Sequence, residues 1–80
     1  MANFFFDITD GTRTSFDRMG IELEDEETAR TEATRTLTEI AAQELPGDGP
    51  SRALKIQVSD AEGKVLFEVQ LDFNTVEASD

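Results

Sequence analysis

The chain has 80 residues, of which 18 are acidic and 7 are basic, and its formal net charge is −11 at pH 7. A chain of this length builds one small core, and its negative charge opposes direct binding to nucleic-acid phosphates. Cysteine and histidine are both absent, which excludes disulfides and removes the usual ligands of zinc and iron–sulfur sites.

The block Phe4-Phe5-Phe6 opens the first predicted strand. Strand side chains alternate between two faces, so Phe4, Phe6 and Ile8 share one face and Phe5 lies on the other. Asp7 ends the apolar block too early for a secretory signal, and no stretch approaches the ~18 apolar residues of a membrane span. We therefore expect a cytoplasmic protein that does not bind membranes.

Asp10-Gly11 predicts a hairpin turn into a second strand over residues 13–16, and residues 17–20 predict another turn. An acidic stretch over 22–27 follows, in which Asp25 is the predicted N-cap of a helix. These carboxylates lack the alternating ligands and turn glycine of a calcium loop, so they do not predict a metal site.

One amphipathic helix is predicted from Glu26 to about residue 45, with Glu26 and Arg30 as a weak ion pair. Its apolar residues recur at spacings of three and four: Ala29, Ala33, Leu37, Ile40 and Ala41. Pro-Gly-Asp-Gly-Pro at 46–50 ends the helix and predicts a flexible connection. It follows a helix and contains no lysine, so it does not resemble a phosphate-binding loop.

Alternating apolar residues over 54–59 and 65–73 flank a turn at 60–63 and predict a second hairpin. Residues 74–80 show no pattern and are expected to fray as an acidic tail. The order β-β-α-β-β predicts a single small α+β domain over residues 1–73. We expect a mostly antiparallel four-stranded sheet with the helix packed on one face. The predicted core is Phe4, Phe6, Ile8, Phe16, Leu37, Ile40, Leu54, Ile56, Val58, Val65, Phe67, Val69 and Leu71, with Ala29 and Ala33 at the helix contact.

One helix covers one face of such a sheet, so the other face meets either water or a partner. Phe5 and Leu66 are predicted to point away from the helix and, if they are neighbours, to form a small apolar patch. Isolated exposed apolar residues are common and need no function. Chance exposure and a surface for a partner or for self-association therefore both remain open. Pairing of edge strands is a second route to a homodimer.

Three segments of the chain carry a family resemblance. They are Asp17, Gly20, Glu22, Leu23 and Asp25 before the helix, Ala29 and Ala33 within it, and Asp60, Gly63, Val65 and Leu66 in the last hairpin. With its aromatic first strand, the chain resembles a widespread family of short bacterial proteins that carry a domain of unknown function. The resemblance runs from Asn3 to about Leu71 and implies the same fold. Glu24 departs from it where a proline is common, and threonines replace helix alanines. The family has no assigned activity, so the resemblance implies no catalytic residues.

Sequence patterns do not predict an enzyme, because the serines have no base positioned by a motif and the carboxylate clusters look solvated. We expect no catalytic, cofactor-binding or metal-binding residues and no small-molecule ligand. The leading hypothesis is a small acidic interaction module that binds a protein or a second copy of itself. The alternative is an acidic mimic of nucleic acid that occupies a basic nucleic-acid-binding protein. Salt separates the two, since mimicry depends on unscreened charge.

Overall fold

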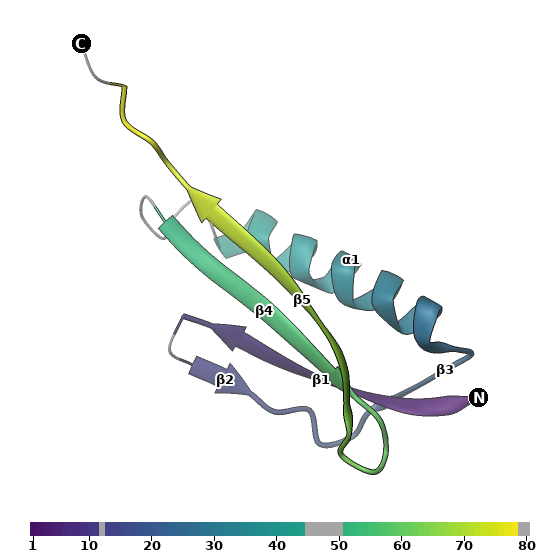
Figure 1. Cartoon of the computed structure of the whole chain (residues 1–80). Coiled ribbons are helices and arrows are strands. Elements are labelled where there is room, and N and C mark those ends of the chain that lie inside the picture. Colours follow the sequence, from purple (N-terminus) through teal and green to yellow (C-terminus); the bar gives the residue numbers. More distant parts are fainter. Residues whose placement is uncertain (12, 45–50, 79–80) are drawn as a thin grey trace.

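A computed structural model describes residues 1–11, 13–44 and 51–78 of the chain. In this part of the chain, five antiparallel strands form one sheet and a single helix lies along one of its faces (Figure 1). The elements in chain order are β1 (Ala2–Asp10), β2 (Arg13–Ser15), β3 (Ile21–Leu23), α1 (Glu26–Glu44), β4 (Ser51–Ser59) and β5 (Val65–Asn74). The predicted α+β class and the antiparallel sheet are confirmed, and β3 adds a short strand before the helix.

The strand order is β2-β1-β4-β5, and β3 also pairs with β1. Ile8 of β1 pairs with Ser15 of β2, and Phe4 pairs with Ile21 of β3. Between these pairs, the Phe6 N–H donates to Asp17 Oδ2 at 3.1 Å. Phe4, Phe6 and Ile8 are alternate residues of β1, so their backbone N–H and C=O groups point to the same edge of the strand. β2 and β3 therefore both lie along this edge of β1. They form a single arm that is interrupted at residues 16–20.

Asp25 caps the helix, as predicted. Its Oδ1 accepts hydrogen bonds from the Thr28 N–H at 2.8 Å and from the Thr28 hydroxyl at 2.7 Å, and these bonds lower the Asp25 pKa. The predicted ion pair between Glu26 and Arg30 is present at 3.9 Å on the exposed side. The predicted end of the helix and the connection at 46–50 lie outside the described residues.

The core lies between α1 and the helix-facing side of β1, β4 and β5. Its buried side chains are Phe4, Phe6, Ala29, Ala33, Leu37, Ala41, Leu54, Ile56 and Val58, and Ile8, Ile40, Phe67, Val69 and Leu71 pack around them. At Ala29, Ala33 and Ala41 the helix presents only a methyl group to the sheet, so the two layers can approach closely at these positions. Most of the predicted core is therefore confirmed.

Phe16 is the first correction to the predicted core, because 68% of its surface is exposed. Ser15 pairs with Ile8 and therefore shares its helix-facing side. Alternation then directs Phe16 to the opposite side of the sheet. The hydrophobic character of Phe16 is visible in the sequence, but its face depends on a register that only strand pairing sets.

Val65 is the second correction, with 47% of its surface exposed. Phe67 pairs with Val58, whereas Val65 pairs with Ser59, so the register shifts by one residue at this point. Such a β-bulge places two residues of one strand opposite one residue of the other. Val65 consequently shares the side of Ser59, away from α1.

Residues 75–78 continue beyond β5 as an exposed segment without regular secondary structure (Figure 1). Within the described ranges, no helix has both the length and the apolar character needed to cross a membrane.

Candidate functional site

The side of the sheet that faces away from α1, here called the open face, is covered by no other helix or strand of the described chain. Phe5 lies on this face, as predicted, and pairs with Ser59 of β4. Ser59 in turn pairs with Val65 of β5. Leu66, the other predicted surface residue, is partly buried and packs against the core instead. The structure therefore brings Phe5 into one row with Val65 and not with Leu66.

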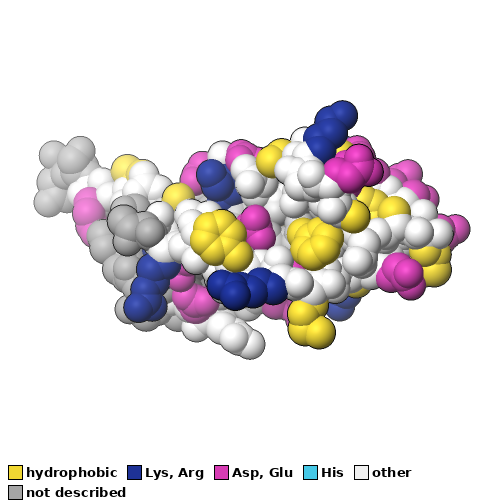
Figure 2. Space-filling view, turned by 90° about the horizontal axis from the view of Figure 1, so that it is seen from below, with side chains coloured by type: hydrophobic (Ala, Val, Ile, Leu, Met, Phe, Trp, Pro, Cys, Tyr) yellow, Lys and Arg dark blue, Asp and Glu magenta, His cyan; other side chains and the backbone are white. Residues whose placement is uncertain are grey.

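A shallow hollow of about 250 Å³ lies over Phe5 and is here called the Phe5 hollow. Its walls come from β1, from the interruption at 16–20, from the end of β4 and from the turn that precedes β5. The lining residues are Phe5, Asp7, Phe16, Asp17, Ser59, Asp60, Ala61 and Gly63. On the surface shown in Figure 2, hydrophobic side chains stand as separate groups among acidic, basic and polar ones. On this side of the molecule, the apolar surface is thus divided into small groups.

Asp17 holds one wall of the hollow in place. Its backbone N–H donates to Asp7 Oδ1 at 2.9 Å. Its own carboxylate accepts three backbone N–H groups, from Phe6 at 3.1 Å, Met19 at 3.1 Å and Gly20 at 3.0 Å. The carboxylate replaces the backbone partner that a continuous edge strand would have offered to Phe6. The interruption between β2 and β3 is therefore a closed, hydrogen-bonded loop.

The pKa of Asp17 lies below its usual value. Partial burial acts to raise this pKa, but the hydrogen bonds from the N–H groups of Gly20, Phe6 and Met19 lower it by more. Because the folded pKa is below the unfolded value of about 3.9, Asp17 stabilises the fold above that pH. The contribution is lost as the pH falls through the folded pKa. At neutral pH, Asp17 is a charged structural acceptor.

Gly20 belongs to the same loop and lies against the Phe5 ring. Its φ of +74° favours glycine, and a Cβ atom at this position would lie 3.0 Å from Phe5 Cζ and 3.2 Å from the Phe4 carbonyl oxygen. The spacing Asp17-x-x-Gly20 therefore has a structural explanation. The aspartate accepts the N–H groups of the loop, and the glycine lets the loop close over the Phe5 ring.

Asp60 and Gly63 repeat this arrangement on the opposite wall. Asp60 Oδ1 accepts the N–H groups of Glu62 and Lys64, both at 2.9 Å. The Gly63 N–H donates to the Asp60 carbonyl at 3.1 Å, and Gly63 has a φ of +84°. Two aspartate-to-glycine turns, far apart in the sequence, therefore meet across the Phe5 hollow. Sequence patterns indicated both turns but not that they share a site.

The Phe5 hollow is lined by acidic and aromatic side chains. Asp7, Asp17 and Asp60 supply negative charge, and Phe5 and Phe16 supply aromatic surface. Nowhere in the described ranges do three or more acidic side chains form a group that could hold a metal ion. The hollow combines acceptors with apolar contacts, which suits a polar or cationic group carried by an apolar stem.

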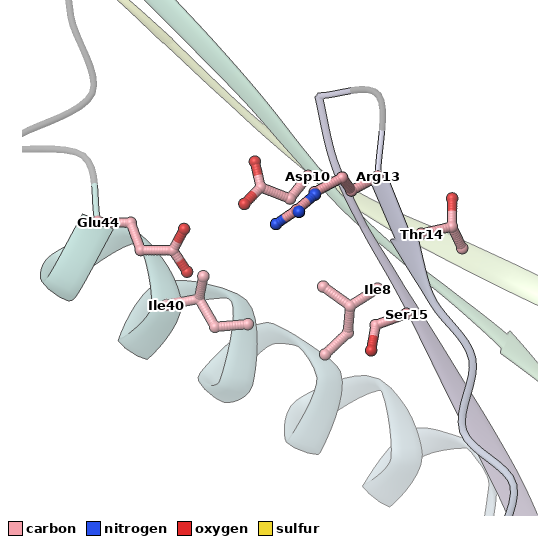
Figure 3. Close-up of a pocket in the computed structure, with 7 residues that line it drawn as sticks. All are labelled: Ile8, Asp10, Arg13, Thr14, Ser15, Ile40 and Glu44. Carbon is pink, nitrogen blue, oxygen red and sulfur yellow. The ribbon is translucent and has the colours of Figure 1, made fainter.

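A larger open groove of about 620 Å³ lies on the other side of the sheet, between α1 and the hairpin of β1 and β2 (Figure 3). Ile8 and Ile40 point into it from opposite walls. Its lining residues are Ile8, Asp10, Arg13, Thr14, Ser15, Ile40 and Glu44. Sequence patterns missed this groove, because it exists only where β2 extends the sheet beyond the edge of the helix.

Both acidic side chains that line the groove, Asp10 and Glu44, pair with Arg52. Arg52 Nε donates to Asp10 Oδ1 at 2.6 Å, and an Arg52 terminal nitrogen lies 3.4 Å from Glu44 Oε1. The hydrogen bond from Arg52 is the main cause of the lowered pKa of Asp10. This cluster ties the C-terminal part of α1 to β1 and β4, so we interpret it as structural.

Comparison with known proteins identifies the family. A family model described as a domain of unknown function, DUF6894, matches residues 3–72. The chain belongs to this family. The expected membership of a family of unknown function is thereby confirmed, and the DUF6894 match includes both walls of the Phe5 hollow. Neither the curated proteins nor the solved structures contain a match to the chain.

Proposed function

We propose that this DUF6894 domain is a protein-interaction module that binds a partner through its open face and has no catalytic activity. One observation carries the proposal. Phe16, a large apolar side chain, is 68% exposed beside the part-buried Phe5, on a sheet face that no other helix or strand of the described chain covers. Exposed apolar surface with a polar rim is typical of contact sites between proteins.

Rigidity of the hollow supports this proposal. Gly20 contacts the Phe5 ring, and the Asp17 carboxylate binds three N–H groups of the surrounding backbone. A surface that is already ordered loses less conformational entropy when a partner binds. Phe5 is therefore a suitable fixed floor for an inserted side chain.

The absence of catalysis is also part of the proposal. The chain has no histidine or cysteine, which are the commonest general base and thiol nucleophile. A general acid or base that works at neutral pH needs a raised carboxyl pKa, whereas the pKa of Asp17 is lowered. The surroundings of Asp17 suit a structural anion better than a proton-transfer group.

Mimicry of nucleic acid is the competing proposal and rests on a different surface. The approach to α1 carries a run of exposed acidic residues: Glu22, Glu24, Asp25, Glu26 and Glu27. Such a surface would attract a basic protein through charge alone, and added salt would screen the attraction. Phe16 would have no part in that binding.

The test is capture of partners from a cell lysate at about 0.05 M and about 0.5 M NaCl, with identification by mass spectrometry. Phe16→Ser is compared with Val76→Ser, a control that removes an 82% exposed apolar side chain outside the open face. We expect a partner that wild type and Val76→Ser retain at both salt concentrations and that Phe16→Ser loses. Circular dichroism checks that both variants fold.

Two other results would contradict the proposal, and a third would narrow it. Basic proteins that are retained only at low salt, with or without Phe16, would favour mimicry. Partners that Phe16→Ser still binds at high salt would place the contact elsewhere. Capture of the protein itself alone, with dimers in sedimentation, would restrict the surface to self-association.

A further inference from the structure

Acceptor groups of the Phe5 hollow remain available after the two turns have formed. Asp7 and Asp60 each use Oδ1 for backbone N–H groups, and their Oδ2 atoms accept no hydrogen bond within the described residues. The lining contains no lysine or arginine. Two carboxylate oxygens with no donor of their own therefore lie in the same hollow as two phenyl rings.

We propose that the Phe5 hollow is a receptor for an arginine side chain of a partner protein. This inference rests on the proposed function and names the group that the open face recognises. The guanidinium donates to the free oxygens of Asp7 and Asp60, and its flat surface lies against the aromatic side of the hollow. Phe16, which is largely exposed, closes over the inserted side chain.

Arginine fits this combination better than lysine does. Its guanidinium is planar, carries five N–H donors, is weakly hydrated and stacks on aromatic rings. Lysine presents a compact, strongly hydrated charge that gains less from a phenyl surface. The chain already contains one contact of this type, because the Arg30 guanidinium carbon lies 5.1 Å from the centre of the Phe67 ring.

Charge complementarity selects a basic partner over other occupants. The chain carries a net charge of −11, so it attracts a basic segment and repels anions and a second copy of itself. Asp7, Asp17 and Asp60 add negative charge in the hollow itself, beside Phe5 and Phe16. We therefore expect the partner to present an arginine on a basic surface.

The direct test is an amide-resolved NMR titration of the full chain with the peptide acetyl-Gly-Arg-Gly-amide. Matched peptides with lysine or with uncharged citrulline in place of arginine serve as comparison probes. We expect the arginine peptide to shift the amides of Phe5, Asp7, Phe16 and Asp60, with a Kd of about 1–10 mM, as befits one side chain. The lysine peptide should bind about threefold more weakly, and the citrulline peptide should produce no saturable shift.

Substitutions in the Phe5 hollow test whether the arginine peptide binds there. Asp7→Asn removes a charge but keeps the Oδ1 acceptor for the Asp17 N–H, and Phe16→Ser removes the exposed ring. Each should weaken binding of the arginine peptide by about threefold. Asp72→Asn is the matched control, because it makes the same charge change on the open face near the other end of β5. It should leave the Kd unchanged.

The inference is overturned if no amide of the hollow shifts, if lysine binds as tightly as arginine, or if Asp72→Asn weakens binding as much as Asp7→Asn. Its failure can be told from failure of the proposed function. If a lysate partner depends on Phe16 but the arginine peptide does not bind, the proposed interaction module stands and only the arginine receptor is ruled out. If the peptide binds but no lysate partner depends on Phe16, the arginine site stands and the proposed interaction module is ruled out.

Discussion

At the scale of single residues, Asp17 and Gly20 show how a short motif can shape a loop. Asp17 satisfies three backbone N–H groups where the edge strand is interrupted, and Gly20 allows the loop to approach Phe5. In the second turn the Asp60 carboxylate accepts two backbone N–H groups, and the space beside Gly63 is open. The two glycines share a backbone requirement and differ in their contacts.

This difference makes a prediction about glycine substitution. Gly63→Ala should lower the free energy of unfolding by about 1–2 kcal/mol, the cost of a left-handed backbone for a residue with a Cβ atom. Gly20→Ala should lower it by about 2–4 kcal/mol, because its Cβ also crowds the Phe5 ring. Urea unfolding followed by circular dichroism measures both values. Equal losses would show that the Cβ added at position 20 is accommodated beside Phe5 at no cost in stability.

At the scale of elements, α1 is stabilised mainly by what it packs against. Three of its threonines donate their hydroxyls to backbone carbonyls one turn earlier: Thr31, Thr34 and Thr38. Threonine is a mediocre helix former, and such bonds compete with the helix rather than strengthen it. Burial of Ala29, Ala33, Leu37 and Ala41 against the sheet supplies the stability that local preference lacks.

Ala33 provides the prediction at this scale. It is fully buried between α1 and the sheet, so Ala33→Leu should force the two layers apart and lower the free energy of unfolding by about 1–3 kcal/mol. Ala42→Leu makes the same change at an exposed position of the same helix and should alter stability by no more than about 0.5 kcal/mol. Urea unfolding of both variants provides the comparison. Similar losses in the two would mean that helix propensity, and not packing distance, limits this position.

At the scale of the whole molecule, a strong net charge surrounds a small core. The described ion pairs are on or near the surface, and the excess of 11 negative charges repels itself in the compact state. Salt screens this repulsion over a Debye length of about 8–10 Å. Stability should therefore depend on ionic strength more than the number of ion pairs suggests.

The corresponding prediction concerns salt. Raising NaCl from about 0.02 M to about 0.3 M should increase the midpoint temperature of unfolding of the wild-type chain. The double variant Glu22→Gln and Glu24→Gln, which has two fewer negative charges on an exposed segment, should gain less. Thermal unfolding in matched buffers measures the effect. A midpoint that falls with salt would show that the surface ion pairs outweigh the general repulsion.

The sequence by itself determined the helix, four of the five strands with their order, and most of the core; only the short strand β3 was missed. Alternation assigned Phe4, Phe5 and Phe6 to their faces, and helical spacing found the buried alanines of α1. Asp25 was recognisable as a cap, and both turns were recognisable from an aspartate and a glycine three residues apart. All of these signals are local, since they depend on residues within one or two turns of chain.

Tertiary structure decided which surfaces these elements create. The faces of Phe16 and Val65 depend on the pairing of Ser15 with Ile8 and on the bulge opposite Val58, and a shift of one residue reverses a side chain. The meeting of the two turns over Phe5, and the position of Leu66 against the core, follow from the same pairing. Strand register is a property of two chain segments together, so the pattern of either segment alone does not contain it.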